Sequence, residues 1–221
     1  VDRLLDNGRR HGMEKFVYVS SGEVYGEGDG RAFTEDYSGY VDPMSVRSCY
    51  PSSKRAAETL CVAYAHEFCV DVSVARPSHV YGPCFTEGDK RVYAEFIRDV
   101  IGGDDIVMKS DGMKFRSWCY VVDCASALLY ILLKGESGKA YNIADESSNK
   151  TIRELAIMVA DIGGRQLRVE LPPDAAATGG TPITKAVFDT SRLRGLGWSV
   201  DGTMEEKMRA TIEEAARQAE A

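Results

Sequence analysis

A tyrosine and a lysine at the expected start of a helix are the residues of this sequence best suited to chemistry. Tyr50 and Lys54 lie four residues apart in the segment SCYPSSKRAAE, residues 48–58, so they share one face of that helix. A tyrosine hydroxyl becomes an effective base at neutral pH when a nearby cation favours its phenolate, and Lys54 can supply that charge. The pair is therefore suited to take a proton from an alcohol while a hydride leaves the carbon.

Ser21 can complete such a site. It follows the hydrophobic run FVYVS at 16–20, and its hydroxyl can donate a hydrogen bond to the oxygen that Tyr50 deprotonates. Taken alone, the spacing of Tyr50 and Lys54 is more often that of a capping aromatic residue and a solvated lysine. The catalytic interpretation therefore depends on the elements that bring Ser21 and Tyr50 together.

Strands and helices alternate along the chain. Runs rich in β-branched and aromatic residues predict strands at 16–20, 70–75 and 140–144. Apolar residues at helical spacing predict a helix after Pro51, another over 120–135, a third over 151–164 with a Thr-x-x-Glu capping box, and a peripheral amphipathic helix over 203–221. This alternation predicts an α/β protein with a mainly parallel sheet.

Polar residues and glycines follow two of the predicted strands directly. FVYVS runs into SGEVYG, and VSVA runs into RPSHVYGP. Open parallel sheets carry their sites at the carboxyl ends of the strands, so these loops should form the edge of a cleft. The segment PPDAAATGGTP at 172–182 is predicted to be an exposed loop.

Composition excludes several classes of function. The chain has 221 residues and a net charge of −7, from 34 acidic and 27 basic side chains, so a nucleic acid or an anionic membrane is not the expected partner. No run approaches the roughly 20 apolar residues that span a bilayer. Six cysteines without a CxxC pair, beside three histidines, disfavour a zinc site and a disulfide framework, so we expect reduced thiols in a cytoplasmic protein.

Five motifs in order give a resemblance to a known family. They are YVSSGEVYG, YPSSK, ARPSHVYGP, RSWCYVVD and YNIA, and they extend over nearly the whole chain. This set resembles the extended short-chain dehydrogenases/reductases, the NAD-dependent sugar-nucleotide epimerases, dehydratases and decarboxylases. The resemblance implies a partial Rossmann-like doubly wound parallel sheet with a smaller C-terminal substrate-binding lobe, NAD as cofactor and a nucleotide-diphosphate sugar as ligand.

The resemblance assigns roles to individual residues. Tyr50 and Lys54 match the catalytic tyrosine and the lysine that also holds the nicotinamide ribose, and Ser21 matches the catalytic Ser or Thr. The remaining matches are Pro77, Ser78 and His79 beside the nicotinamide, Arg116 at the nucleotide diphosphate, and Lys185 at a phosphate. NAD is favoured over NADP only because members of the family usually use NAD.

Two departures bear on the reaction. His79 stands where the family usually has an asparagine that contacts substrate phosphate. Its charge could make substrate affinity depend on pH, or it could be a neutral loop residue. Gly22-Glu23 stands where dehydratases have Asp-Glu, so the acid is absent and simple 4,6-dehydration is disfavoured. Glu23 remains, as in UDP-glucuronate decarboxylases, either as a catalytic group or as a charge at the cleft edge.

The glycine-rich cofactor turn of the family is not found. GEVYGEGDG has glycines, but its three carboxylates would repel a pyrophosphate. We expect roughly 100 residues of the nucleotide-binding domain to precede this segment in the family. Residues 1–83 are predicted to be the C-terminal part of the NAD-binding domain, and residues 84–221 mainly the substrate-binding lobe, with 116–144 returning to the Rossmann core.

Two functions remain open from the sequence. The first is the catalytic part of an epimerase, dehydratase or decarboxylase, inactive as this chain alone and binding NAD poorly by itself. The second is a non-catalytic sugar-nucleotide-binding or interaction protein derived from such an enzyme. A parallel sheet without its further strands leaves apolar faces and edges exposed, so we expect a homodimer or another form of self-association.

Overall fold

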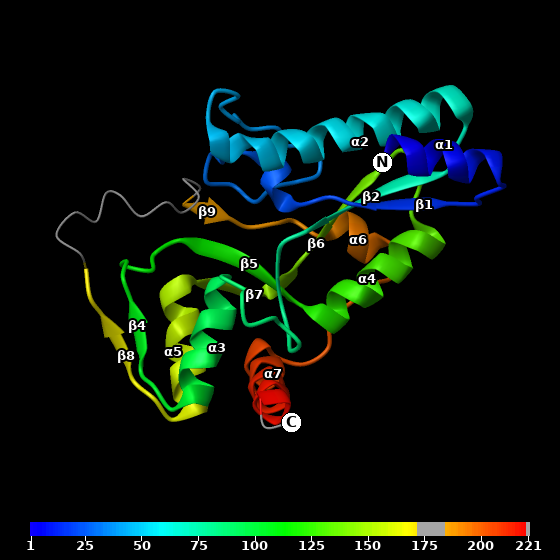
Figure 1. The fold of residues 1–221 in the computed structure, drawn as a ribbon. Helices are drawn as coiled ribbons and strands as arrows, with labels where there is room; N and C mark the ends of the chain where they lie inside the picture. The colour runs from blue at the N-terminus through cyan, green and yellow to red at the C-terminus, as the bar shows by residue number, and fades with distance from the viewer. Residues whose placement is uncertain (172–183, 220–221) are drawn as a thin grey trace.

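The first sheet of the protein is parallel and lies between helices on its two faces (Figure 1). The computed structural model describes residues 1–171 and 184–219. Strands β1 (Phe16–Val19), β2 (Val72–Pro77) and β6 (Ala140–Ile143) pair in the order β1-β2-β6, all parallel. The α/β class and the parallel sheet expected from the sequence are confirmed, although β2 lies two residues later than predicted because its pairing with β6 continues to Pro77.

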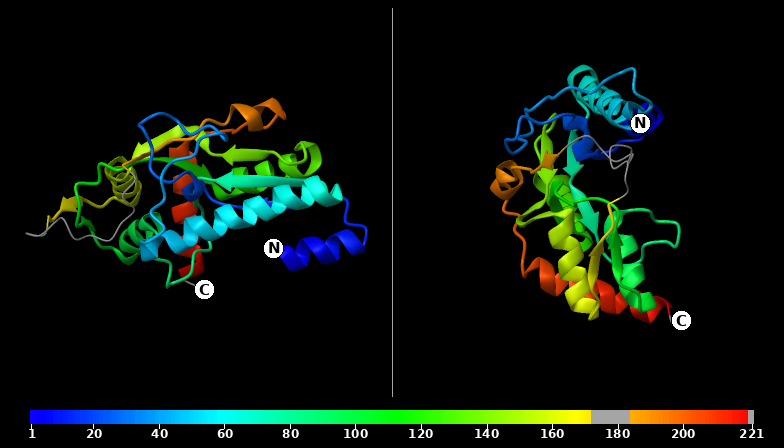
Figure 2. Two further views of the ribbon diagram at one scale, coloured as in Figure 1. Left: turned by 90° about the horizontal axis from the view of Figure 1, so that it is seen from above. Right: turned by 90° about the vertical axis from the view of Figure 1, so that its left-hand side faces the viewer.

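Helices cover both faces of this sheet. Helices α1 (Asp2–Arg10) and α2 (Cys49–Phe68) lie on one face, as the view from above in Figure 2 shows, and α4 (Val121–Lys134) lies on the other. Alternate strand residues point to opposite faces, so Val72 and Val74 pack with Leu5 and Cys61, while Ala75 packs with the α4 side. The three layers bring the carboxyl ends of β1 and β2 beside the start of α2.

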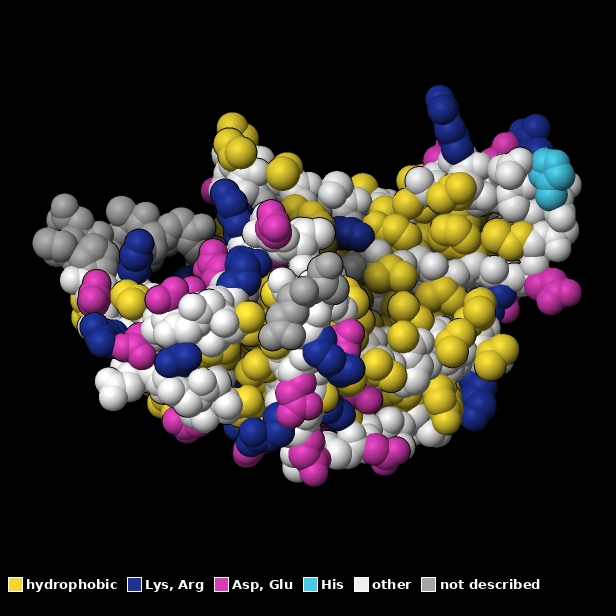
Figure 3. All heavy atoms as spheres, turned by 60° about the horizontal axis from the view of Figure 1, so that its bottom comes forward, with side chains coloured by type: hydrophobic (Ala, Val, Ile, Leu, Met, Phe, Trp, Pro, Cys, Tyr) yellow, Lys and Arg dark blue, Asp and Glu magenta, His cyan; other side chains and the backbone are white. Residues whose placement is uncertain are grey.

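The outer surface of α4 is strongly apolar. Figure 3 shows hydrophobic side chains gathered over α4 and the neighbouring β1. On α4 the exposed fractions are 60% for Val122, 59% for Leu129, 40% for Leu132 and 79% for Leu133. Within the described residues, β1 is paired on one side only, by β2. An apolar helix face therefore lies next to a sheet edge with free hydrogen-bonding groups.

A second sheet lies beside the first. Strand β5 (Phe115–Tyr120) is its centre, with β3 (His79–Tyr81) and β9 (Lys185–Ala186) parallel to it and β7 (Asp145–Thr151) antiparallel. The pairing of β5 with β7 shifts register between Arg116 and Trp118. Strand β3 follows β2 after one residue, so the chain passes from one sheet to the other at Ser78.

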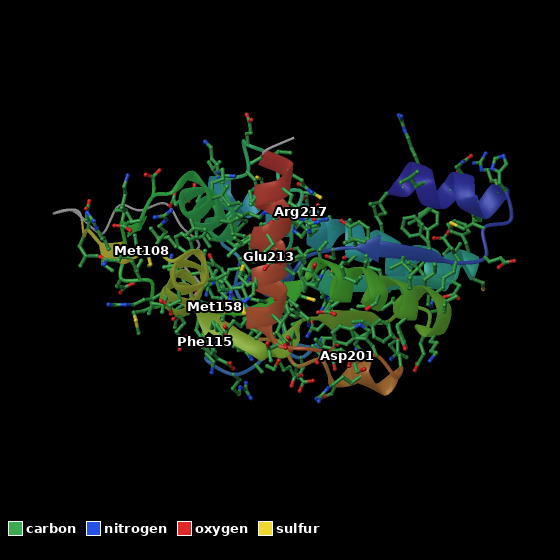
Figure 4. The ribbon with its side chains drawn as sticks, turned by 90° about the horizontal axis from the view of Figure 1, so that it is seen from below. Met108, Phe115, Met158, Asp201, Glu213 and Arg217 are labelled. Atoms are coloured by element: carbon green, nitrogen blue, oxygen red, sulfur yellow. The ribbon has the colours of Figure 1, made fainter. Side chains whose placement is uncertain are left out.

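Three helices form the second core. Helices α3 (Val92–Gly102), α5 (Ile152–Gly163) and α7 (Met204–Ala219) pack together, with the short parallel strands β4 (Ile106–Met108) and β8 (Leu167–Val169) at their side. The last helix is amphipathic, as predicted, with one buried face and one exposed face. Its apolar face, with Met208 fully buried, packs into this core, while Glu213 and Arg217, labelled in Figure 4, lie on its exposed side.

Local signals in the sequence set several element boundaries. The capping box of α5 is present, with Thr151 and Glu154 each bonded to the other's backbone, and Gly164 ends the helix in the left-handed conformation. Helix α2 begins at Cys49, so Pro51 lies in its first turn, where its missing N–H costs no helical hydrogen bond. The short helix α6 (Ser191–Gly195) follows β9. The loop predicted at 172–182 lies outside the described residues.

Among the described residues no helix is long and apolar enough to cross a membrane, and no group of three or more His, Cys, Asp or Glu side chains could hold a metal ion. All six cysteines are free thiols.

Candidate active site

A cleft of about 570 Å³ opens where the two sheets meet. The segments after β1 and β2 form one wall, the start of α2 and the start of α3 form the rim, and β5 and the residues after β9 form the other wall. Its lining includes Ser20 to Glu23, Arg47, Tyr50, Pro77 to Val80, Arg91 to Tyr93, Arg116, Trp118, Ala186 and Phe188. Most of the residues to which the sequence assigned a role therefore share one cavity.

Ser21 and Tyr50 face this cleft from neighbouring segments. Ser21 ends the loop after β1 and caps a short helix, η1 (Gly22–Tyr25), where its Oγ accepts a hydrogen bond from the backbone N–H of Glu23 at 3.2 Å. An accepting hydroxyl still has its own proton to donate. Tyr50 lies in the first turn of α2 with 41% of its surface exposed. Both residues therefore line the same cavity.

Lys54 lies beside Tyr50 rather than in the cleft. Its Nζ donates a hydrogen bond to the carbonyl of Val19, the last residue of β1, at 2.9 Å. The same ammonium lies 5.8 Å from the ring centroid of Tyr50 and 5.2 Å from that of Tyr18. The hydrogen bond fixes a positive charge next to the ring of Tyr50.

Glu23 forms an ion pair across the mouth of the cleft. Arg47, on the short helix η2 (Val46–Ser48) that precedes α2, places its Nη2 2.8 Å from Oε1 of Glu23. Both side chains remain partly open, with 50% of Arg47 and 35% of Glu23 exposed. The pair joins the segment of Ser21 to the segment of Tyr50.

Gly22 explains why the dehydratase acid is missing. A Cβ at this position would lie 2.0 Å from Cζ of Phe188. Phe188 is 3% exposed, and its ring packs against Tyr25 and Phe33 with centroid distances of 5.6 and 5.9 Å. The ring of Phe188 therefore occupies the space that an aspartate at position 22 would need.

His79 is neutral over the physiological range. Its side chain is open to the cleft, yet protein surrounds it closely, and its ring lies 5.4 Å from that of Trp118. Desolvation, together with the charge of Arg116, lowers the pKa of His79 to about 4. Of the two interpretations left open by the sequence, the geometry favours a neutral hydrogen-bonding residue. It begins β3 rather than lying in a loop.

Two further arginines line the same cavity. Arg116 is 2% exposed, its Nη1 donates to the carbonyls of Phe115 at 2.9 Å and Thr184 at 3.2 Å, and its burial lowers its pKa. Arg91 precedes α3 and is held by Asp89, with Nη2 at 2.5 Å from Oδ2 and Nε at 2.9 Å from the same oxygen. The cleft thus gathers positive charge in a protein whose net charge is −7.

Lys185 does not line this cleft. It lies on β9, and its Nζ donates a hydrogen bond to the carbonyl of Gly30 at 2.7 Å. Its neighbours Ala186 and Phe188 line the cleft instead.

Two buried hydroxyls of the cleft have no partner in the described part of the chain. They are Ser20 Oγ, after β1, and Ser78 Oγ, between β2 and β3, and both residues line the cavity. A buried hydroxyl without a hydrogen bond is costly, and such groups are commonly satisfied by a ligand or by water. These positions fit the polar edge of a nicotinamide, since Ser78 belongs to the segment that the resemblance places beside it.

Sequence reasoning did not single out Arg47, Arg91, Trp118 or Phe188. Arg47 had a usable signal, because it lies one helical turn before Tyr50. Phe188 had none, since its contact with Gly22 joins segments that are far apart in the chain.

Comparison with known proteins agrees with the motifs. UDP-glucuronic acid decarboxylase 5 of Arabidopsis thaliana is 32% identical over 175 residues, which are 78% of this chain and 51% of that protein. Two solved structures are the UDP-glucose 4-epimerases of Thermus thermophilus with NAD (26% identity, TM-score 0.83) and Thermotoga maritima with UDP-glucose (25% identity, TM-score 0.84). Each match covers 98% of this chain and 68% of the other.

The chain spans between 43% and 64% of the length of the first three curated relatives that it matches. The Rossmann-type fold and the extended short-chain dehydrogenase/reductase membership expected from the motifs are confirmed. The model of the NAD dependent epimerase/dehydratase family matches residues 1–144, and the chain belongs to that family.

Proposed function

We propose that this chain is the catalytic and substrate-binding part of an enzyme that oxidises a hydroxyl of a nucleotide sugar to a transient ketone. The observation that supports it most is the placement of Ser21 and Tyr50 in one cleft, with the Lys54 ammonium fixed beside Tyr50 by the Val19 carbonyl. These are the groups that an alcohol oxidation needs on its proton side.

Each group has a role in the proton transfer. Ser21 donates a hydrogen bond to the sugar oxygen and orients it, Tyr50 removes the hydroxyl proton as a phenolate, and Lys54 stabilises that phenolate. NAD, when bound, would supply the hydride acceptor for the same carbon. The residues of this chain would thus orient the sugar oxygen and remove its proton. The electron pair of the C–H bond would leave with the hydride.

The nicotinamide side of NAD fits the residues present. Tyr50 and Lys54 would hold the ribose, and Pro77, Ser78 and His79 would lie along the nicotinamide, with the unpartnered hydroxyls of Ser20 and Ser78 available to its amide. Among the described residues there is no strand, glycine turn and helix to hold the pyrophosphate. We therefore expect weak NAD binding and no turnover from this chain alone.

The nucleotide would lie toward α3. Arg116 and Arg91 supply positive charge for a diphosphate, and neutral His79 can donate a hydrogen bond to it. A second hollow of about 560 Å³ shares Val92 with the lining of the cleft and is also lined by Phe96, Val107, Met108 and Lys109 among others, and we place the nucleoside on this side. Lys185 has two further N–H donors besides the one that it gives to the carbonyl of Gly30, but it lines neither hollow.

Decarboxylation or epimerisation suits the site better than dehydration. Phe188 excludes an acid at position 22, while Glu23 stays at the mouth of the cleft. Oxidation of the hydroxyl next to a carbon that bears a carboxylate yields a β-keto acid, which loses carbon dioxide readily. The decarboxylase relative makes this branch the first to test.

Self-association is part of the proposal. The exposed apolar face of α4 and the open edge of β1 together offer a surface that water solvates poorly (Figure 3). We expect copies of the chain to cover it by pairing with each other. The cytoplasmic location expected from the sequence stays a prediction.

The alternative is a non-catalytic protein that binds nucleotide sugars. The set of Ser21 and Tyr50 in one cleft, with Lys54 beside Tyr50, argues against it. Loss of catalysis would leave no reason to keep a lysine fixed beside the tyrosine.

One experiment separates the two. The full-length protein is incubated with NAD and a panel of UDP-, dTDP-, CDP- and GDP-sugars, and the products are identified by mass. Replacement of Tyr50 by Phe should lower turnover by at least about 100-fold and leave nucleotide-sugar binding intact, because only the proton acceptor is removed. Unchanged turnover in that variant would refute the mechanism, and binding without any product would support the alternative.

A further inference from the structure

Arg47 is the cleft arginine whose hydrogen-bonding capacity is least used. In the described part of the chain its guanidinium makes one hydrogen bond, from Nη2 to Oε1 of Glu23 at 2.8 Å. A guanidinium has five N–H donors arranged in a rigid fork that suits a carboxylate. Most of the donors of Arg47 are therefore available to a ligand, and half of the side chain is exposed to it.

The other two cleft arginines are engaged differently. In Arg91, Nε donates to both carboxylate oxygens of Asp89, and Nη2 donates to Oδ2 of the same residue. Arg116 is buried and donates to two backbone carbonyls. Of the three, Arg47 has the side chain that can change its partner at least cost.

The position of Arg47 places it at the sugar rather than at the nucleotide. It lies one turn before Tyr50 and is bonded to Glu23, two residues after Ser21. The hollow available to the nucleoside begins instead at Val92. A substituent on the ring carbon next to the reacting hydroxyl would thus come close to Arg47.

We propose that Arg47 recognises a carboxylate on the sugar, with Glu23 occupying its fork when the cleft is empty. The inference rests on the proposed function and names its substrate class, a nucleotide-linked hexuronate. When the hexuronate binds, Arg47 turns from Glu23 to the substrate carboxylate or bridges the two. A neutral hexose offers no second carboxylate, so the ion pair with Glu23 stays closed.

The charges make this exchange favourable. A hexuronate carboxylate beside Glu23 alone would be repelled, and only a cation between the two removes that repulsion. A solvent-exposed ion pair contributes little to stability, so Arg47 gives up little by leaving Glu23. A forked hydrogen bond to a carboxylate that has lost its water is stronger than the exposed contact it replaces.

The test is a comparison of two ligands that differ only in that carboxylate. Binding of UDP-glucuronate and UDP-glucose to the full-length protein with NAD is measured by calorimetry for the wild type, Arg47→Gln and Arg47→Lys. Arg47→Gln should weaken UDP-glucuronate binding by about 10- to 100-fold, because one charge-assisted hydrogen bond is lost. The same variant should change UDP-glucose binding by less than about 3-fold. Arg47→Lys should restore part of the preference, since it keeps the charge without the fork.

Two further variants serve as controls. Arg209→Gln removes an arginine that is equally exposed, at 51%, and paired with Glu205 on α7, and it should change neither affinity. Glu23→Gln removes the competing negative charge and should keep or strengthen the preference for UDP-glucuronate.

The outcomes are distinct. If Arg47→Gln weakens both ligands equally, its role is structural and the inference is wrong, and it is wrong as well if neither ligand is affected. If the wild type binds neither UDP-sugar, and no other nucleotide sugar of the panel, the proposed function fails and the inference fails with it.

Discussion

The contact between Gly22 and Phe188 gives a prediction whose size can be worked from the structure. In Gly22→Ala the new Cβ would lie 2.0 Å from Cζ and 2.6 Å from Cε2 of Phe188, far inside van der Waals contact. Forcing an extra carbon into a packed core costs about 1–3 kcal/mol. Alanine regains about 0.5–1 kcal/mol of backbone entropy, so the net loss should be about 1–2 kcal/mol.

The assay is unfolding by urea and by heat. A loss of this size should lower the Tm of a chain of this length by about 2–8 °C. Gly195→Ala is the matched control, because Gly195 also lies in a short helix but has nothing within 4 Å of its Cβ position. That variant should be as stable as the wild type or slightly more so.

A second variant tests the cause. Phe188→Leu shortens the side chain that blocks position 22, so Gly22→Ala should cost less in that background than in the wild type. If Gly22→Ala is neutral in the wild type, or costs the same in the Phe188→Leu background, the ring of Phe188 is not what keeps an acid out of this position.

Two other predictions follow from the same structure. The folded-state pKa of His79, about 4, lies below the ordinary value of 6.5, so the unfolded chain binds more protons between these values. The free energy of unfolding should therefore fall as pH drops from about 6.5 to 4. In the His79→Asn variant it should fall less steeply over that window, as measured by urea titrations at several pH values. Leu133→Glu places a charge on the most exposed leucine of α4, and it should shift the chain toward monomer by light scattering. A wild-type chain that is a clean monomer with a high Tm would contradict the proposed self-association.

Local patterns predicted much of the fold. The strand at β1, the helix α4 with its stop at Gly135 and the capping box of α5 were all readable, because each depends on residues within one or two turns of one another. The helices against which α7 packs could not be predicted from the sequence. The apolar face of this helix was visible as a pattern, yet that pattern cannot say whether the face meets α3 and α5 or remains at the surface.

Some residues of the candidate site could likewise be predicted from local sequence, and others could not. Ser21, Tyr50 and Lys54 could be assigned by type, spacing and order, and the structure places the first two in one cleft with Lys54 beside them. Lys185 was matched by spacing alone, and in the structure it bonds to Gly30 outside that cleft. Spacing along the chain does not specify the direction in which a side chain leaves a short edge strand.

The sequence by itself determined the α/β class and the family of this protein, because both are encoded in short contiguous motifs, and the same motifs supplied the proposed proton-transfer residues. Only the tertiary structure decided that Arg47 pairs with Glu23, that Phe188 fills the space beside Gly22, and that His79 is neutral. Each of these depends on the space and the charge that distant segments bring to one place. Such contacts arise through packing and desolvation, which local sequence patterns do not record.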